Sequence, residues 1–521
     1  MPGTGFAAGS AAEQIRLAED ALAAGRFKEA VNALRKALPL DQESPRPRLM
    51  LGYALWRSGQ RAEAIQTLQQ LVEMAPDNAD AWFNLGNFYR TERRFDDAVA
   101  AFRRAVPLRQ DNAEPWINLG YVLAQQGHFA EAQRELGEAI ARFPREPDLL
   151  VNLAQVQRAT RHWNDALATL DRCLALAPHH NGYRITRSIA LDESGQPDRA
   201  LAELSALLDS APAIAEARFA RAQMRLSRRD WGGWEDYLWR PDRLRWLAKQ
   251  GMRPTQPAAT RAEVAGRDVV LVGEQGLGDV VFFLRFAKLL EPAARSVRAE
   301  VDSRLEPILP REWTSSPEGS AVPIRILLGD LPAMFQQGPL PSLELAADAG
   351  RSAELKARLS SCGPAPYIGV SWQAGVPWRD MSAPGAGIFK RVPPADLGRT
   401  LRAIPGTLIS LQRAAPAGDV EALSAAAERP VQDFSWVNES LPDALALLAG
   451  LHDYVAVSNT NVHLNEAIGR STRVLVTHPS EWRWTRDDER SPWFRHAVAY
   501  RQAQDGSWAT ALHALRKDLG G

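Results

Sequence analysis

The chain has few of the residues that build disulfide or metal sites. Its 521 residues include two cysteines, Cys173 and Cys362, and nine histidines scattered along the sequence. Two cysteines are too few for a disulfide framework, and neither lies in the spacing of a metal-binding motif. No HExxH pair occurs either. The sequence therefore predicts no metal site and no cofactor bound by such a motif.

Long apolar runs and an excess of one charge are also missing. No run of about 18 uncharged apolar residues occurs, which predicts that no transmembrane helix is present. The first residues, MPGTGFAAGSAAEQ, have neither the basic segment nor the apolar core of a signal peptide, so we expect a cytoplasmic location. The 62 Lys+Arg balance the 62 Asp+Glu, which disfavours nucleic-acid binding through bulk charge. Only seven of the basic residues are lysines.

A period of 34 residues is present throughout the first half of the chain. The repeated feature is an alanine followed, four positions later, by a large apolar residue. The alanines are Ala30, Ala64, Ala98, Ala132, Ala166 and Ala200. Small residues let two helices pack closely, and a recurring proline twelve positions after the alanine ends the second helix. This pattern matches the tetratricopeptide repeat. It predicts six units over residues 11–214, a degenerate seventh from Ala215, and a helical solenoid over residues 11–250.

Stacked repeats of this kind form a superhelix with a long concave groove, which favours binding of an extended partner segment. Asn84, Asn118 and Asn152 recur at the repeat spacing on the inner helices. Such a ladder of amides is suited to hydrogen bonding with a peptide backbone of any sequence. Two alternatives stay open: the asparagines satisfy turns between helices, or the array only spaces or dimerises the protein.

The second half changes to alternating strands and helices, which predicts parallel sheets. Residues 251–266 have the proline and glycine content of a linker. Two Rossmann-like halves are then expected, over residues 267–360 and 361–521. The expected strands are Arg267–Gly273, Val297–Asp302, Ile324–Leu328, Tyr367–Trp372, Thr407–Gln412, Tyr454–Ser458 and Thr472–Val476. The expected helices are Val280–Ala294, Ala395–Ala403, Asp419–Ala427, Pro442–Leu448, Val462–Ile468 and Trp508–Leu519.

Three loops follow predicted strands, where parallel sheets bind their ligands. The loop GEQGLGD (Gly273–Asp279) has glycines at Gly276 and Gly278 that let a backbone approach a ligand, although it fits neither GxGxxG nor a P-loop. The second loop is Ser371–Asp380. The third, Ser458–Gly469, begins a helix, with Thr460 or Asn461 as its expected cap. Free amides at that helix start predict an anion site suited to a diphosphate, and His463 is expected to face the same cleft.

Together, the second-half motifs resemble the GT-B glycosyltransferases of the ADP-heptose:LPS heptosyltransferase type. The shared elements are the GxGD turn after the first strand, the GVSW strand, and the pattern V-S-N-T-x-x-H-L-x-x-A-x-G. With its repeats, GW-x-x-Y and EWRW, the chain is most similar to bacterial fusions of tetratricopeptide repeats with such a domain. The two-module architecture also resembles O-linked N-acetylglucosamine transferases.

The resemblance implies roles for particular residues. Asp279 matches the aspartate proposed as general base, and Lys390 matches a lysine near the donor phosphates. The phosphate cradle implied by the resemblance comprises Gly276, Gly278, Ser458, Asn459, Thr460, Asn461 and His463. Further possible donor contacts are Trp372, Gln373, Arg379 and Gln412. The sequence has no DxD, which fits a metal-independent reaction with a nucleotide sugar as co-substrate. The family's acidic residue in the last loop is replaced here by the neutral Ser458 or Asn459.

Two functions compete at this point. In the first, the chain is a glycosyltransferase whose repeats hold an acceptor protein, such as bacterial flagellin or another surface protein. In the second, the GT-B domain is degenerate and the chain is a non-catalytic interaction scaffold. A lipid-linked saccharide acceptor is a third, less favoured possibility.

Overall fold

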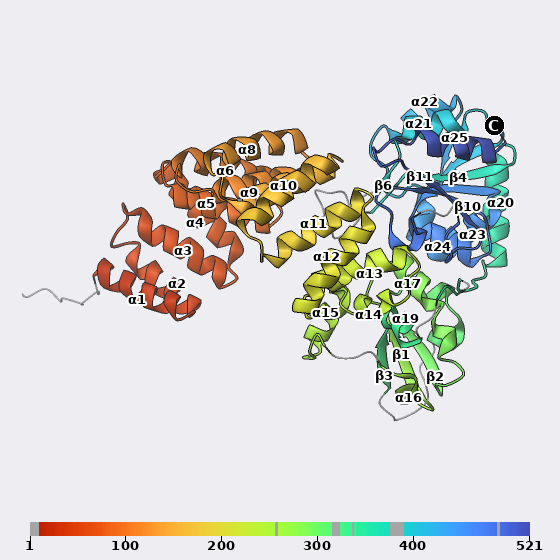
Figure 1. Ribbon diagram of the computed structural model, residues 1–521, viewed down its shortest axis with the longest axis horizontal. Helices are drawn as coiled ribbons and strands as arrows, with labels where there is room; N and C mark the ends of the chain where they lie inside the picture. Colours follow the sequence, from red (N-terminus) through yellow and green to blue (C-terminus); the bar gives the residue numbers. More distant parts are fainter. Residues whose placement is uncertain are drawn as a thin grey trace, which may run out of the picture. The chain divides into compact units, whose positions relative to one another are not determined.

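The computed structural model describes residues 10–255, 259–314, 323–335, 338–340, 342–375, 390–486 and 490–520 (Figure 1). The chain divides into two compact units. One ends at Tyr183 and the other begins at Arg184, so the division falls within helix α11 (Asn181–Glu193) and inside the repeat series. The domain boundaries expected at residues 250, 266 and 360 stay predictions.

The first unit consists of helices in successive antiparallel pairs, which confirms the predicted helical repeat array (Figure 1). Each helix packs on the next along the chain, both within a pair and between pairs. The helices are α1 (Ala11–Ala23), α2 (Phe27–Ala37), α3 (Pro45–Arg57), α4 (Arg61–Met74), α5 (Ala79–Thr91), α6 (Phe95–Leu108), α7 (Glu114–Gln125), α8 (Phe129–Arg142), α9 (Pro147–Ala159) and α10 (Trp163–Leu176).

The 34-residue period corresponds to buried contacts inside each pair. The six repeated alanines and the apolar residues four positions later are all fully buried. In three of the pairs, the facing helix carries a glycine at the point of closest approach. A Cβ atom on Gly86 would lie 2.7 Å from the Phe102 ring, and one on Gly120 would lie 2.4 Å from Leu136. The pairs therefore approach closely because the glycines have no side chain.

The turn inside each pair is also repeated. The residue two positions after the first helix has a positive φ of 61° to 88° in seven consecutive units. These residues are Gly25, Gly59, Arg93, Gly127, Arg161, Gly195 and Arg229. A residue in the left-handed backbone conformation ends a helix, because it turns the chain so that the next amides bond to the last carbonyls of the helix. Glycine adopts this conformation without steric cost.

The second unit begins with the remaining helices of the series. They are α11, α12 (Pro197–Ser210), α13 (Ala215–Ser227) and the short α14 (Gly233–Tyr237), followed by α15 (Pro241–Lys249) and α16 (Arg261–Val264). A three-stranded parallel sheet follows, in the order β2-β1-β3. Its strands are β1 (Asp268–Val272), β2 (Ser296–Glu300) and β3 (Ile324–Leu327), as predicted, and the helices beside it are α17 (Leu277–Leu284), α18 (Arg311–Thr314) and α19 (Leu331–Phe335).

Helix α17 ends ten residues earlier than predicted. The Arg285 Nε donates a hydrogen bond to the Phe282 carbonyl at 2.9 Å, which occupies an acceptor that the next helical turn needs. The Phe286 amide bonds to Phe283 instead, at the tighter three-residue spacing. A short 3-10 helix, Ala287–Leu289, follows.

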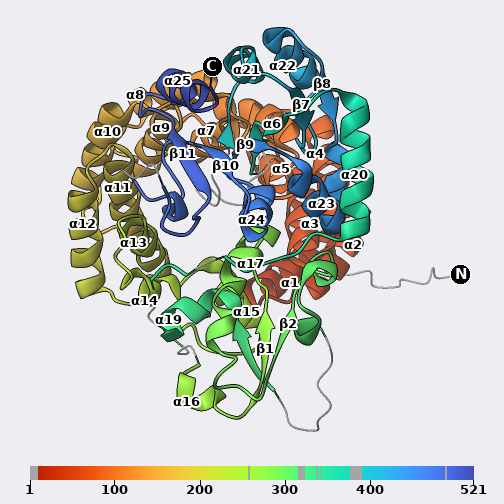
Figure 2. The same ribbon diagram turned by 90° about the vertical axis from the view of Figure 1, so that its right-hand side faces the viewer.

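The second sheet has six parallel strands in the order β11-β10-β9-β4-β7-β8 (Figure 2). The predicted strands are present, and β8 and β11 are additional edge strands. The strands are β4 (Tyr367–Ser371), β7 (Thr407–Ser410), β8 (Val431–Asp433), β9 (Asp453–Val457), β10 (Thr472–Val476) and β11 (Ala497–Arg501). The parallel α/β character of the second half is thus confirmed, whereas its assignment to GT-B stays a prediction.

Helices cover both faces of this sheet because its strands are apolar on both sides. Along β9, Val455 packs into one core, whereas Tyr454 and Ala456 pack into the other. One face is covered by α21 (Pro394–Leu401), α22 (Asp419–Ala427) and α25 (Ala509–Asp518). The other is covered by α20 (Ala349–Cys362), α23 (Leu441–Gly450) and α24 (Thr460–Ala467). Strands buried on both faces are typical of parallel sheets.

The close approach at Gly120 leads to a stability prediction. Gly120→Ala places a methyl group against Leu136 in a full core, which should lower the free energy of unfolding by about 1–3 kcal/mol. Gly137→Ala is the matched control, since Gly137 lies in a helix with open space around its Cα, and it should raise stability by up to about 1 kcal/mol. Urea denaturation followed by circular dichroism measures both. Equal effects of the two substitutions would contradict this account of the repeat glycines.

Candidate functional site

The loop GEQGLGD joins β1 to α17 and lies against helix α24 of the other sheet. Gly276 is the cap residue of α17, and Asp279 lies in the first turn of that helix. A Cβ atom on Gly278 would lie 3.0 Å from the His463 ring and 3.4 Å from the Thr460 Cα. The missing side chain of Gly278 thus lets the first turn of α17 approach the first turn of α24.

The last predicted loop runs from the end of β9 into α24. The cap of that helix is Asn459, whose side chain accepts a hydrogen bond from the Val462 amide at 3.1 Å, and not Thr460 or Asn461 as expected from the sequence. The Asn461 side chain instead donates to Asn438 at 3.0 Å. The amides of Thr460 and Asn461 belong to the first turn of the helix, where backbone donors lack partners within the helix.

His463 is buried between the two sheets, with 7% of its surface exposed. Its ring makes edge contacts with Phe282 and Phe494. Within the described residues, its Nδ1 atom has no hydrogen-bond partner. Burial lowers the pKa of His463 well below its ordinary range, and the positive charges of Arg483 and Arg285 lower it further. The imidazole is therefore neutral near pH 7 and has a ring nitrogen available for a further hydrogen bond.

Lys390 lies in the two-residue strand β6 (Lys390–Arg391), which pairs with β5 (Gln373–Ala374). Its ammonium donates to the Ser458 carbonyl at 3.0 Å and forms an ion pair with Glu481 at 2.6 Å. The Ser458 hydroxyl donates to the other Glu481 oxygen at 2.8 Å. Lys390 and Ser458, two predicted phosphate contacts, are therefore brought together around a carboxylate of the chain itself.

Glu481 was not identified as a site residue from the sequence. Burial raises its pKa, but the nearby charges of Lys390 and Arg483 outweigh burial and bring the pKa of Glu481 down to about 2. The residue is thus a carboxylate throughout the physiological range. The signal that could have identified it is its position, just beyond the carboxyl end of β10.

The segment Glu481–Trp484 contacts both predicted charged residues of the site. Arg483 pairs with Asp279, as Glu481 pairs with Lys390. The alternate residues, Trp482 and Trp484, are buried in the core at 5% and 1% exposure. Trp482 makes edge contacts with Trp234, Phe282 and Trp493, at centroid distances of 5.3, 5.4 and 5.9 Å. We call Glu481–Trp484 the clasp segment.

The other possible donor contacts have structural partners. Both backbone amides of Trp372 and Gln373 donate to the Gln412 side-chain oxygen, at 2.9 and 2.8 Å. The Gln412 amide nitrogen donates back to the Gln373 carbonyl at 3.1 Å. The buried Trp372 indole donates to Asp419 at 2.8 Å. Arg379 lies outside the described residues.

The three asparagines predicted to bind a peptide lie in the first unit, in helices α5, α7 and α9, and are half-buried. Asn152 donates a hydrogen bond to the Ile117 carbonyl of the preceding repeat at 3.0 Å. The acceptor lies within helix α7 and not in a turn between helices. The peptide-binding role of the three asparagines and their alternative role in turns both stay predictions.

Metal-binding side-chain clusters and membrane-spanning helices are both absent from the described residues. Within those residues, no three His, Cys, Asp or Glu side chains lie together in a way that could hold a metal ion. Likewise, none of the described helices has the length and apolar character needed to span a bilayer.

Parts of this chain are similar to known proteins. Models of the tetratricopeptide repeat match residues 49–115, 123–187 and 185–233. Protein FlbA of Caulobacter vibrioides is 26% identical over an alignment of 382 residues, and the alignment covers 65% of this chain and 61% of that protein. The cytochrome c-type biogenesis protein CycH of Rhizobium meliloti is 41% identical over 64 residues, or 12% of this chain and 16% of that protein. The chain thus spans less than two thirds of the length of either relative.

Solved structures with a likeness to this chain are also repeat proteins. A tetratricopeptide repeat protein from Parabacteroides merdae is 14% identical, with a TM-score of 0.40, over 44% of this chain and 90% of its own. YrrB, described as a TPR protein with an unusual peptide-binding site, is 19% identical, with a TM-score of 0.32, over 37% and 99%. The matches to the tetratricopeptide-repeat family models show that the chain contains these repeats, and such repeats imply a protein partner.

The ion pair of Glu481 leads to a prediction about acid stability. A carboxylate with a lowered pKa stabilises the folded state above its unfolded pKa and loses that effect as the pH falls toward its folded pKa. Glu481→Gln should therefore lower the free energy of unfolding near neutral pH. The deficit relative to wild type should shrink as the pH falls from 4.5 to about 2.

Urea denaturation at a series of pH values measures this deficit. Glu421→Gln, a change at an exposed glutamate of α22, is the matched control and should give no such pH-dependent difference. A deficit of constant size down to pH 3 would show that the Lys390–Glu481 pair does not hold the carboxylate ionised.

Proposed function

We propose that the chain is a metal-independent glycosyltransferase. It would move a sugar from a nucleotide-sugar donor to an acceptor protein bound by the repeats, with flagellin or another bacterial surface protein as an example. One observation carries this proposal. Asp279, Lys390 and the first turn of α24 lie at the carboxyl ends of parallel strands, where the two sheets of the second unit meet. Ligands of parallel α/β folds bind at such edges.

Each of these groups suits one part of the transfer. Lys390, as a point charge, and the opening amides of α24 are suited to the donor phosphates, which must be stabilised as they leave with the bond to the sugar. Asp279 is suited to accept the proton of the acceptor hydroxyl as the new bond to the anomeric carbon forms. Arg483 fixes the Asp279 carboxylate, and the neutral His463 has a nitrogen for a further hydrogen bond.

The competing proposal is an interaction scaffold with an inactive domain. A specific observation favours it: Asp279 and Lys390 are each already paired with an opposite charge from the clasp segment. A donor phosphate would have to share Lys390 with Glu481. Calorimetry with a panel of nucleotide sugars separates the two proposals, because a scaffold with an inactive domain would bind none of them.

The proposed base leads to a prediction for Asp279→Asn. Loss of the proton acceptor should reduce nucleoside-diphosphate release and acceptor glycosylation by at least about 100-fold, with donor affinity within about twofold because the proposed charged donor contact, Lys390, lies beside the other sheet. Intact-mass analysis of a co-expressed acceptor and calorimetry measure the two effects. Unchanged turnover would exclude Asp279 as the base, and a parallel loss of donor affinity would indicate a structural role.

Asp268→Asn is the matched control for this experiment. Asp268 is also paired with an arginine, Arg295, but it lies at the amino end of β1, opposite the proposed site. Its substitution should leave turnover unchanged, even where it lowers stability.

The phosphate role leads to a separate prediction for Lys390→Gln. This change should weaken binding of the nucleotide sugar by at least about tenfold, because a charge-assisted contact to phosphate is lost. The donor affinity is measured by calorimetry, together with the urea midpoint, since Glu481 loses its partner in this variant. Donor binding equal to wild type would exclude Lys390 from the donor site.

A further inference from the structure

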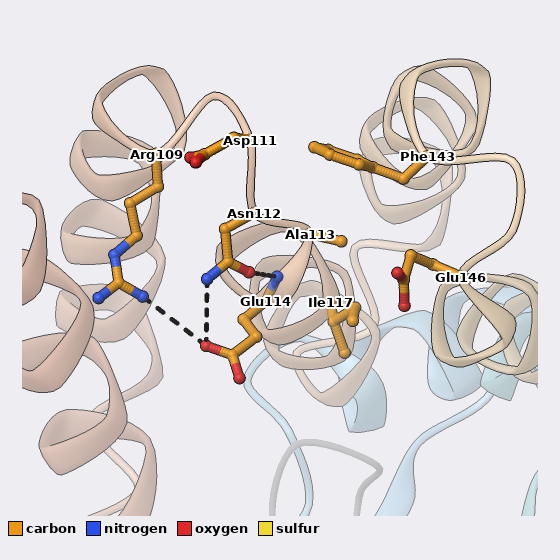
Figure 3. Close-up of a pocket in the computed structure, with 8 residues that line it drawn as sticks. All are labelled: Arg109, Asp111, Asn112, Ala113, Glu114, Ile117, Phe143 and Glu146. Atoms are coloured by element: carbon orange, nitrogen blue, oxygen red, sulfur yellow. Dashed lines mark hydrogen bonds and ion pairs between the residues drawn. The ribbon is translucent and has the colours of Figure 1, made fainter.

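The first unit contains a hollow of about 540 Å³ between two neighbouring repeats (Figure 3). One wall is the turn before helix α7, and the other is the turn before α9. Ile117 lies deeper in the hollow, and the Phe143 ring projects into it from the second turn (Figure 3). The lining residues are Arg109, Asp111, Asn112, Ala113, Glu114, Ile117, Phe143 and Glu146.

The hollow is acidic, because three carboxylates and a single guanidinium line it. Arg109 is engaged elsewhere: it pairs with Asp80, and its guanidinium lies 4.7 Å from the centroid of the Phe83 ring. It lies 3.7 Å from Glu114, a long contact for an ion pair. Among the described residues, no ion pair links Asp111 or Glu146 to a cation. Within the described part of the chain, the charges of Asp111 and Glu146 are therefore not neutralised by an ion pair, and that of Glu114 is met only at 3.7 Å.

The preceding repeat shows what fills the equivalent space. At a spacing of 34 residues, Asp80 corresponds to Glu114, Phe83 to Ile117, and Arg109 to Phe143. In that repeat, the Arg109 side chain occupies the space, with its guanidinium on the acid and over the apolar floor. In the next repeat the acid and the apolar floor remain, but phenylalanine replaces the arginine. The hollow thus keeps the acid and the apolar floor that hold an arginine in the preceding repeat, with Phe143 in place of that arginine.

We propose that this hollow binds an arginine side chain from an extended segment of the partner protein. A guanidinium can stack on the Phe143 ring and at the same time donate hydrogen bonds to the carboxylates of Asp111, Glu114 and Glu146. A lysine ammonium offers neither the flat face nor the forked geometry. The volume lies within the range of ligand sites. This inference goes beyond the proposed transferase activity and does not need it.

The probe is the peptide acetyl-Gly-Ser-Arg-Ser-Gly-amide, compared with the same peptide carrying glutamine in place of arginine. Saturation-transfer difference NMR with the full-length chain measures binding of both, without any sugar donor. We expect the arginine peptide to bind with a Kd on the order of 1 mM, as for one charge-assisted contact at a surface. The glutamine peptide should give no comparable signal.

Phe143→Arg is the decisive variant, because it installs the arginine that the preceding repeat carries at this position. The new side chain should pair with Glu114 and reduce binding of the arginine peptide by at least about tenfold. The double variant Asp111→Asn/Glu146→Gln keeps the Phe143 packing and should weaken binding about fivefold. If Phe143→Arg unfolds at a lower urea concentration than wild type, this double variant tests whether the hollow binds the arginine peptide.

Glu138→Gln, a change at an exposed glutamate of α8 outside the hollow, is the control for the loss of charge and should bind as wild type does. The proposal would be overturned by equal binding of the two peptides, by no binding of either, or by wild-type affinity in the pocket variants. Because no donor is present, these outcomes leave the transferase proposal untouched, and loss of transferase activity in Asp279→Asn leaves this one untouched.

Discussion

The architecture of the second unit depends on the clasp segment, Glu481–Trp484, and on the cost of burying charge there. Lys390 is 9% exposed and Arg483 is 7% exposed, and an isolated cation at such burial is strongly unfavourable. Glu481 compensates Lys390, and Arg483 is compensated by Asp279 from the other sheet. Trp482 and Trp484 of the same segment pack into an aromatic core that includes Trp234 of α14. One short turn thus connects the end of the repeat series with both sheets.

This arrangement places the structural demands and those of the proposed reaction on the same residues. Breaking a buried ion pair leaves an uncompensated charge, so each partner is needed for the fold. Yet a base needs a carboxylate that can accept a proton, and a phosphate site needs a cation that is not fully compensated. The pairs Asp279–Arg483 and Lys390–Glu481 lie where the two sheets meet, and any ligand that binds there competes with or joins them. The chemistry of this site is therefore determined by the clasp segment as much as by the three loops recognised in the sequence.

In the repeat array, one backbone pattern supports different surfaces. The buried alanines recur in all six units because two helices must pack closely in each repeat, and in three of the pairs a glycine on the facing helix serves the same close approach. The loops between repeats are free of this constraint, and equivalent positions diverge: Arg109 fills its space, whereas Phe143 leaves a hollow. Repetition is thus useful beyond fold assignment, since each repeat is a reference for the next. A missing side chain becomes visible only by that comparison.

Much of the fold could be read from the sequence because its determinants are local. The 34-residue period, the apolar strands and the helix after β9 depend on residues within one or two turns of each other. Prediction failed at sheet edges and at distant contacts. Strand β8 is a three-residue edge strand with little apolar signal, and α17 ends just before Arg285, whose guanidinium donates to the Trp493 carbonyl 208 positions away.

For the site, the sequence by itself determined which loops follow strands. Asp279, Ser458 and His463 were therefore expected near the carboxyl ends of strands. Only the tertiary structure decided their partners. Arg483 pairs with a residue 204 positions away, and a sequence contains no local record of such a contact. Burial makes His463 neutral, whereas the charges of Lys390 and Arg483 outweigh burial and keep Glu481 ionised. The sequence determined the helices and strands, whereas the tertiary fold determined which charged side chains form ion pairs.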